Sequence, residues 1–254
     1  MLIVYAIGQG SLRPSGFVSG WLLLGLIGFL ALYNVRKALP FLPLGSSAGW
    51  LQFHIYCGFL SFVMFAVHLH FKIPSGVFEC GLAAIYLSVF ISGAIGLYIT
   101  RTYPRRLTDL GNEIIFEQIP IARRQIYDQV ESLMFDSSAN SGSTALAEFY
   151  REHIQSFVAS YHDLTAHLLR GSTERHRTLL DAIADQRRYL NDEERRVLDQ
   201  VESLVNRKCQ LDAQYALQGA LKGWLFFHIP ATYALLIFAV LHVVLVHAWN
   251  GGVV

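Results

Sequence analysis

Two apolar stretches of this chain share one pattern of histidines. Residues 49–71 read GWLQFHIYCGFLSFVMFAVHLHF, and residues 223–249 read GWLFFHIPATYALLIFAVLHVVLVHAW. In each stretch a second histidine follows the first by fourteen residues, so His54 and His68 correspond to His228 and His242. On a helix this spacing places two side chains about 21 Å apart along the axis and within about 40° of one face. The pattern therefore predicts two helices that each present two imidazoles on one stripe, at two depths.

The composition favours a membrane protein. The chain is 53% hydrophobic and only 15% charged, whereas a soluble domain has about 25% charged residues. Four stretches contain no Asp, Glu, Lys or Arg and are long enough for a helix to cross the hydrocarbon core. We expect an all-α fold, an integral membrane four-helix bundle, with spans at residues 17–33, 50–71, 81–100 and 223–249.

The acidic residues are concentrated between the third and fourth spans. All but one of the 19 acidic residues lie there, and Glu79 is the exception. We therefore expect residues 1–101 to form the first three spans, residues 102–222 a helical insert, and residues 223–254 the fourth span with a short tail.

Hydrophobic residues recur at helical spacing within the insert. One predicted helix begins at Pro120 and stops before Asp136. A second extends from Leu146 to Leu168. The last begins after Asn191, a residue type that caps helices, and continues towards the fourth span.

The distribution of cations predicts the orientation in the membrane. If the spans alternate, one side carries Arg36, Lys37, Arg101, Arg105, Arg106 and Lys222, and the other only Arg13 and Lys72. By the positive-inside rule the first side is cytoplasmic. We therefore expect a multi-pass protein of a bacterial cytoplasmic membrane, with a cytoplasmic insert and both termini outside. Alternation also makes the second and fourth spans parallel.

Four imidazoles inside apolar helices predict ligand binding. An ionisable side chain in a membrane span is costly and is usually functional. Parallel spans would bring His54 to His228 and His68 to His242, and neutral imidazole is a good ligand for iron. We expect two metal centres, each a haem held between one such pair. Ser61, Thr232 or backbone carbonyls are candidates to accept the second N–H of these rings.

This arrangement resembles the core of the cytochrome b superfamily. Two His-x13-His helices form the second and fourth helices of a bundle in the haem-bearing half of cytochrome b of quinol–cytochrome c oxidoreductase. The membrane domains of ferric reductases and NADPH oxidases are similar more loosely. The resemblance covers the spans and none of the insert. It implies two b-type haems with bis-histidine ligation, the cytoplasmic-side haem on His54 and His228 and the outer haem on His68 and His242.

The chain also departs from that family, so the resemblance does not imply a substrate. It has no Pro-Glu-Trp-Tyr quinol-oxidation motif, no later helices of the cytochrome b C-terminal half and no flavin domain. Arg101, Arg105 and Arg106 either meet haem propionates or serve only as topology signals. His70 and His247 are candidates for an alternative ligand or a quinone site, or are ordinary interfacial residues.

We therefore expect a di-haem cytochrome that moves electrons across the bilayer as the membrane subunit of an oxidoreductase. A soluble cytoplasmic redox partner would dock on residues 102–222, and a quinone or an outer acceptor would exchange electrons. Two alternatives remain open, a transition-metal transporter that uses the same histidines and a non-enzymatic membrane sensor or scaffold. The net charge of +1 argues against a nucleic-acid partner. Cys57, Cys80 and Cys209 lack the spacing of iron–sulfur or c-type haem motifs.

Overall fold

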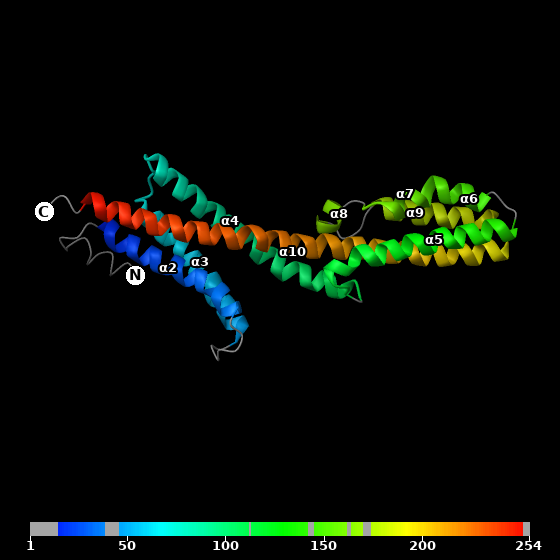
Figure 1. Cartoon of the computed structure of the whole chain (residues 1–254), viewed down its shortest axis with the longest axis horizontal. Helices are drawn as coiled ribbons and strands as arrows, with labels where there is room; N and C mark the ends of the chain where they lie inside the picture. The colour runs from blue at the N-terminus through cyan, green and yellow to red at the C-terminus, as the bar shows by residue number, and fades with distance from the viewer. Residues whose placement is uncertain are drawn as a thin grey trace. The chain divides into compact units, whose positions relative to one another are not determined.

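A computed structural model describes residues 15–38, 46–111, 113–141, 145–161, 164–169 and 174–250. Every regular element in these ranges is a helix, so the predicted all-α class is confirmed for them (Figure 1). Three cations used to predict the orientation, Arg13 and the side chains of Arg36 and Lys37, lie outside the described part. The chain divides into two compact units, Met1–Ile99 with Gly223–Val254, and Thr100–Lys222.

Four helices supply the first unit: α2 (Ser15–Ala38), α3 (Ser47–His68), α4 (Val77–Asp109) and α10 (Asp192–Asn250). Each of them is long and apolar enough to cross a membrane. α4 and α10 also extend into the second unit. α4 continues through Pro104 to Asp109, beyond the predicted end of the third span at residue 100.

Ring contacts establish the directions of these helices. Phe17, near the start of α2, lies 5.5 Å from His247, near the end of α10, measured between ring centres. Phe29, late in α2, stacks at 5.9 Å on Trp50, which is early in α3. α2 is therefore antiparallel to both α3 and α10, so α3 and α10 are parallel, as Figure 1 shows. The proposed histidine pairing requires this relation.

α3 ends at His68, three residues before the predicted end of the second span. His70 and Phe71 have φ angles of 50° and 57°, in the left-handed region that ends many helices. The amide of Phe71 donates a hydrogen bond to the carbonyl oxygen of Ala66 at 3.0 Å. This bond satisfies a carbonyl group of the last turn and directs the chain into the short connection to α4.

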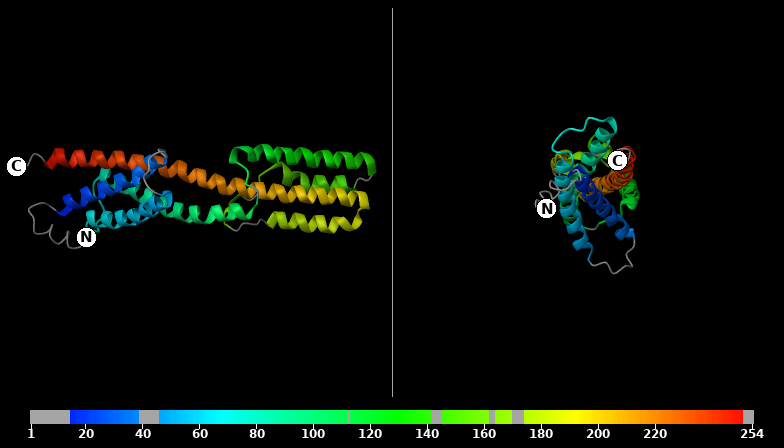
Figure 2. Two further views of the ribbon diagram at one scale, coloured as in Figure 1. Left: turned by 90° about the horizontal axis from the view of Figure 1, so that it is seen from below. Right: turned by 90° about the vertical axis from the view of Figure 1, so that its left-hand side faces the viewer.

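The second unit is built from two long helices, α5 and the first part of α10, and from shorter helices packed beside them. In chain order its helices are η1 (Phe116–Gln118), α5 (Ile119–Ser141), α6 (Ala145–Phe149), the π-helical η2 (Tyr150–Ile154), α7 (Gln155–Ala159), α8 (Leu164–Leu169), α9 (Glu174–Gln186) and η3 (Arg187–Tyr189), followed by the first part of α10. Figure 2 shows α5, α9 and this part of α10 running side by side. Their shared core includes Ile126, Val130, Ile183, Leu198 and Val201.

The predicted helix from Leu146 to Leu168 is wrong, because the chain leaves helical geometry at Ser160, where φ is −121° and ψ is 163°. Arg123 of α5 explains the break. Its Nη2 donates to the carbonyl oxygen of Ser160 at 2.7 Å, and its guanidinium lies 3.5 Å from the centre of the Tyr161 ring. The first insert helix was also predicted too short, since α5 continues past Asp136 to Ser141.

The predicted cap at the start of α10 is confirmed. The Asn191 side chain accepts a hydrogen bond from the amide of Glu194 at 2.9 Å. In return, the Glu194 carboxylate accepts from the amide of Asn191 at 3.1 Å. This reciprocal pair is a capping box, which satisfies two amide groups that the helix leaves unpaired.

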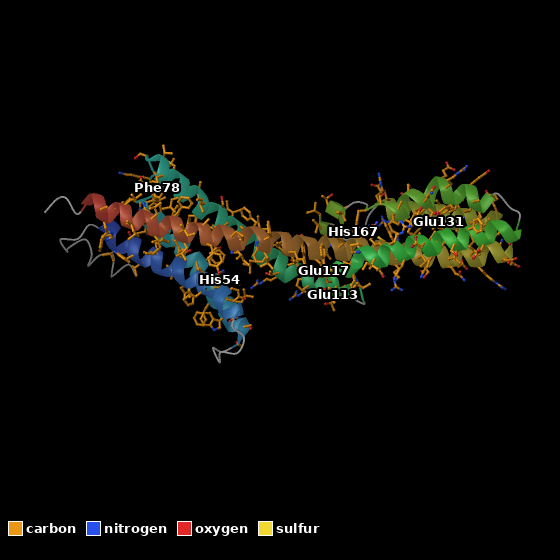
Figure 3. The ribbon with its side chains drawn as sticks, viewed as in Figure 1. His54, Phe78, Glu113, Glu117, Glu131 and His167 are labelled. Atoms are coloured by element: carbon orange, nitrogen blue, oxygen red, sulfur yellow. The ribbon has the colours of Figure 1, made fainter. Side chains whose placement is uncertain are left out.

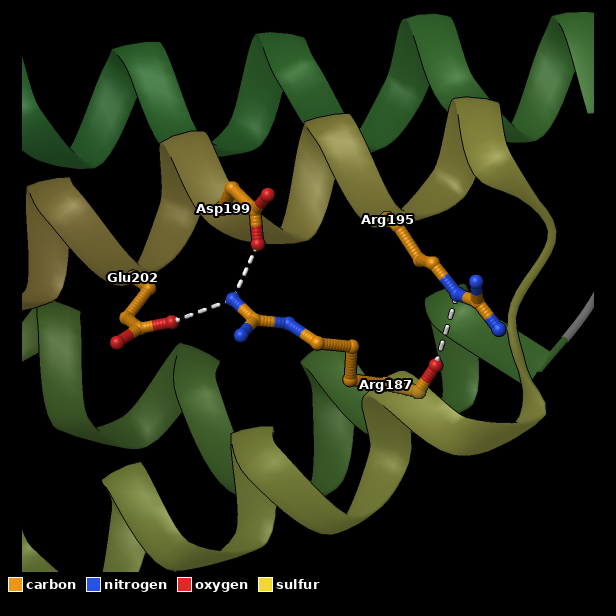
Figure 4. A network of polar contacts seen from close by, with 4 residues as sticks. All are labelled: Arg187, Arg195, Asp199 and Glu202. Atoms are coloured by element: carbon orange, nitrogen blue, oxygen red, sulfur yellow. Dashed lines mark hydrogen bonds and ion pairs between the residues drawn. The ribbon is translucent and has the colours of Figure 1, made fainter.

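An exposed polar network joins η3 to α10 (Figure 4). The Arg187 guanidinium bonds to the carboxylates of Asp199 and Glu202, the latter at 3.0 Å. Arg195 donates from Nε to the carbonyl oxygen of Arg187 at 3.1 Å. Exposed ion pairs of this kind contribute little stability, typically 0–1 kcal/mol each. Their role here is to hold η3 against the first turns of α10.

Candidate functional site

The structure brings His68 of α3 and His242 of α10 together. Their ring centres are 6.5 Å apart and their planes are perpendicular. Two imidazoles on opposite sides of one metal ion, each with a metal–nitrogen distance of about 2 Å, have ring centres about 6 Å apart. The observed separation therefore fits one metal ion held between the two rings.

His54 and His228 belong to the second level of the same two helices, and their side chains are close enough for an electrostatic interaction. Tyr33 packs on the His54 ring at 5.0 Å, and Trp224 stacks on the His228 ring at 5.3 Å. In Figure 3, His54 marks this level and Phe78, which stacks on His242, marks the other.

A cavity of about 540 Å³ surrounds the His68–His242 pair. Its volume lies in the range of 300–1,000 Å³ that is typical of ligand and cofactor sites. Apolar side chains such as Leu23, Phe65 and Leu235 make up much of its wall, and Lys72 and Glu79, both exposed, also line it. The cavity wall thus combines two imidazoles, apolar side chains and two exposed charged groups of opposite sign.

Serine hydroxyls of neighbouring helices contact two of the four histidines. Ser19 of α2 lies 3.2 Å from Nδ1 of His68, and Ser92 of α4 lies 3.2 Å from Nδ1 of His228. Both serines are buried. A hydrogen bond to the second ring nitrogen can orient an imidazole for ligation, and Ser19 and Ser92 are placed to make such bonds.

Of the three kinds of partner that the sequence offered for the rings, backbone carbonyl groups do lie near two of them, Leu30 at His54 and Gly16 at His68, whereas Ser61 and Thr232 do not contact the rings. Ser61 instead donates to the Gly58 carbonyl oxygen at 2.8 Å and contacts the Tyr86 hydroxyl at 2.9 Å. Thr232 donates to the backbone carbonyl oxygen of His228 at 2.8 Å, not to its ring. Ser61 and Thr232 are on the same helices as the histidines, so they are easy to find in the sequence. The serines that contact the rings, Ser19 and Ser92, are on other helices.

Two glycines leave the space that the aromatic rings occupy. A Cβ atom on Gly20 would lie 3.0 Å from Cε1 of His68, and a Cβ atom on Gly96 would lie 2.0 Å from the Trp224 ring. Trp224 also donates from Nε1 to the carbonyl oxygen of Ser92 at 2.8 Å. Gly96 therefore allows α4 to approach α10 closely enough for Trp224 to cover His228.

Replacement of Gly96 by alanine is expected to destabilise the first unit by about 1–3 kcal/mol, the usual cost of overpacking a well-filled site. The added methyl group overlaps the indole of Trp224, so the ring must move off His228 and α4 must shift. Thermal unfolding of the purified chain, followed by circular dichroism, measures the loss. Gly58→Ala in α3 is the matched control, because no atom lies within 4 Å of the added carbon there; an equal loss in both variants would contradict the explanation.

The structure gives different surroundings to His247, His70 and Arg106, the other basic residues considered as part of a haem or quinone site. His247 lines the cavity and packs on Phe17 and Trp21, while His70 is exposed and does not belong to the described residues of the cavity wall. Arg106 donates to the backbone carbonyl oxygens of His167 and Leu168. That engagement within the second unit argues against a role for Arg106 at a haem.

The described residues contain no group of three or more His, Cys, Asp or Glu side chains arranged to hold a metal ion. Comparisons of the chain with protein-family models, with curated proteins and with solved structures gave no match. The histidine pairs, their serine partners and the cavity therefore carry the functional argument by themselves.

Proposed function

We propose that this chain is a di-haem b-type cytochrome of a membrane, the electron-transfer subunit of an oxidoreductase. One observation carries the proposal: two parallel apolar helices each carry two histidines at matching levels, and at one level the rings of His68 and His242 lie 6.5 Å apart. In each pair the two imidazoles would hold one haem through its iron, and no third protein side chain would be needed.

The proposal places α2, α3, the first part of α4 and the last part of α10 across the bilayer. It follows the charge distribution in putting residues 102–222 on the cytoplasmic side of a bacterial membrane and both termini outside. The four apolar helices support the membrane location. The orientation rests on the sequence alone.

The protein's own residues would bind and orient the two haems, whose iron supplies the one-electron chemistry when bound. His54 with His228 would hold the cytoplasmic-side haem, and His68 with His242 the outer haem. The two histidines of each helix are about 21 Å apart along the helix axis. The two haems would therefore lie at two depths in the bilayer, and an electron would pass from one to the other. Apolar side chains around the outer pair exclude water, and low polarity and burial are among the features that tune haem potentials.

The same proposal includes a soluble redox partner that docks on residues 102–222 and a quinone or another acceptor at the outer side. The insert supports this idea because it has its own hydrophobic core of helices, separate from the histidine pairs. If the idea is right, a soluble donor that reduces the purified chain should fail to reduce a chain without the insert.

The proposal is tested by a reduced-minus-oxidised visible spectrum of the purified chain, with haem measured per polypeptide. We expect a b-type α-band and two haems per chain. Stoichiometric zinc or copper without haem would favour the metal transporter. A colourless and metal-free preparation would favour the sensor or scaffold, and either result would overturn the cytochrome.

A further inference from the structure

The position of one hydrogen in the site can be derived from the contacts of Ser19. The hydroxyl oxygen of Ser19 lies 3.1 Å from the carbonyl oxygen of Gly16 and 3.2 Å from Nδ1 of His68. A serine hydroxyl has a single hydrogen to donate, and a carbonyl oxygen can only accept. Ser19 therefore donates to Gly16.

The tautomer of His68 follows from this. Since the hydroxyl hydrogen of Ser19 is already used, the contact with His68 is a hydrogen bond only if Nδ1 carries a hydrogen and donates it to the Ser19 oxygen. The backbone carbonyl group of Gly16 also interacts with this ring, and it too can only accept a hydrogen bond. A neutral imidazole has one N–H, so Nε2 of His68 is left with a free lone pair. Nε2 is then the nitrogen that can bind a metal.

The contact between Ser92 and His228, at the other level of the site, does not define a tautomer in this way. Ser92 contacts Nδ1 of His228 at 3.2 Å, but in the described part of the chain no carbonyl oxygen accepts the hydrogen of its hydroxyl. Ser92 can therefore either donate to His228 or accept from it. The protein fixes the tautomer of His68 and leaves that of His228 open.

We propose that Ser19 is a positioning residue for the outer centre, which fixes the ring orientation and tautomer of His68 and makes it the more strongly donating axial ligand. The inference rests on the proposed function, because it concerns how one of the two haems is held. An N–H···O bond from the far side of an imidazole raises the basicity of the ligating nitrogen. A more basic ligand stabilises oxidised iron, so Ser19 lowers the reduction potential of the outer haem and strengthens its binding.

The burial of Ser19 suits this role. Ser19 lies at the interface of α2 with α3 and is 4% exposed, so water has little access to its hydroxyl group. Gly20, the next residue, leaves room for the ring itself. Of these two neighbouring residues of α2, Ser19 contacts the His68 ring through its hydroxyl group, and Gly20 leaves the space that the ring occupies.

The test is a potentiometric titration of the two haems, together with haem retention, in the full-length chain and in Ser19→Ala. We expect one of the two potentials to rise and the haem at that centre to be bound about 10–100-fold more weakly, while the other centre titrates as before. Ser19→Thr keeps the hydroxyl and should restore both properties. The readout is a potential and an affinity, which a purely structural role of Ser19 would not shift at one centre alone.

Ser61→Ala is the matched control. Ser61 is equally buried, at 3% exposed, and also bonds to a backbone carbonyl of its own helix, but its other contact is Tyr86 and not a histidine. Two unchanged potentials in Ser19→Ala, or the same shift in Ser61→Ala, would overturn the inference. If the unsubstituted chain binds no haem, the proposed function itself fails, so the two failures are distinguishable.

Discussion

A chain with His242 replaced by alanine is expected to bind one haem instead of two. The substitution removes one of the two imidazoles whose ring centres lie 6.5 Å apart, and we expect the single imidazole that remains at this level not to retain the haem. The His54–His228 pair lies fourteen residues away along both helices, so its haem should remain. Haem per polypeptide and the amplitude of the reduced α-band measure the loss.

His247→Ala is the control for this experiment. His247 is on the same helix, lines the same cavity and contacts aromatic side chains of α2, so it is the obvious rival ligand. We expect His247→Ala to keep both haems, because its ring is exposed and packs on Phe17 and Trp21, whereas His242 lies opposite another imidazole. A loss of haem in His247→Ala together with full occupancy in His242→Ala would assign the outer ligand to His247 instead.

The spacing of histidines predicted that His68 of α3 would meet His242 of α10, and the structure shows this contact. Periodicity in one helix fixes the face and depth of each side chain, and the alternation of spans fixes the relative direction of two helices. Both are properties of the chain that do not depend on details of packing. The parallel relation of α3 and α10 and the close contact of His68 with His242 agree with those two rules.

The hydrogen-bond partners of the rings could not be predicted in the same way. Ser19 and Ser92 contact their histidines from α2 and α4, and a contact between helices depends on how each helix is rotated and how closely it approaches. Gly96 shows how sensitive the distance between two helices is to a single side chain, because one added methyl group would force α4 away from α10. Such distances are set by packing, which a pattern of residue types does not specify.

In the insert, too, a long-range contact that the sequence pattern does not reveal changed the structure. Its hydrophobic periodicity predicted the helices whose core residues pack together, but not the break at Ser160. The cause is Arg123, 37 residues earlier in the chain, which binds the Ser160 carbonyl group. A long-range bond from a buried side chain overrode a local preference for helix.

Arg123 also belongs to the buried charge cluster of the insert. The Asp212 carboxylate is 1% exposed and pairs with two cations, Arg123 Nε at 2.9 Å and Lys208 Nζ at 2.6 Å. The Lys208 side chain is fully buried and lies over the Phe157 ring at 4.2 Å. Burial lowers the pKa of the Lys208 ammonium from its ordinary value, and Asp212 opposes this change. Asp212 is therefore the shared counter-charge of two buried cations, and it offsets only part of the cost of burying Lys208.

Asp212→Ala is consequently expected to destabilise the insert by about 3–5 kcal/mol, because both cations lose their buried counter-charge. Chemical denaturation of the purified chain, followed by helical circular dichroism, measures the change. Lys208→Met should cost less, since the Arg123–Asp212 pair remains and methionine fills a similar volume. Asp128→Ala removes an exposed ion pair with Arg124 and should cost no more than about 1 kcal/mol.

The pH dependence separates charge burial from a simple packing defect in Asp212→Ala. Without the carboxylate, the pKa of Lys208 in the folded chain should fall further below its value in the unfolded chain. A lysine with a lowered folded-state pKa destabilises the fold at low pH, where it must be charged, and this penalty disappears as pH rises through the folded-state pKa towards the unfolded one. The deficit of Asp212→Ala relative to the unsubstituted chain should therefore narrow as the solution becomes alkaline. A deficit that stays constant with pH would mean that lost packing, and not an unpaired buried ammonium, destabilises the variant.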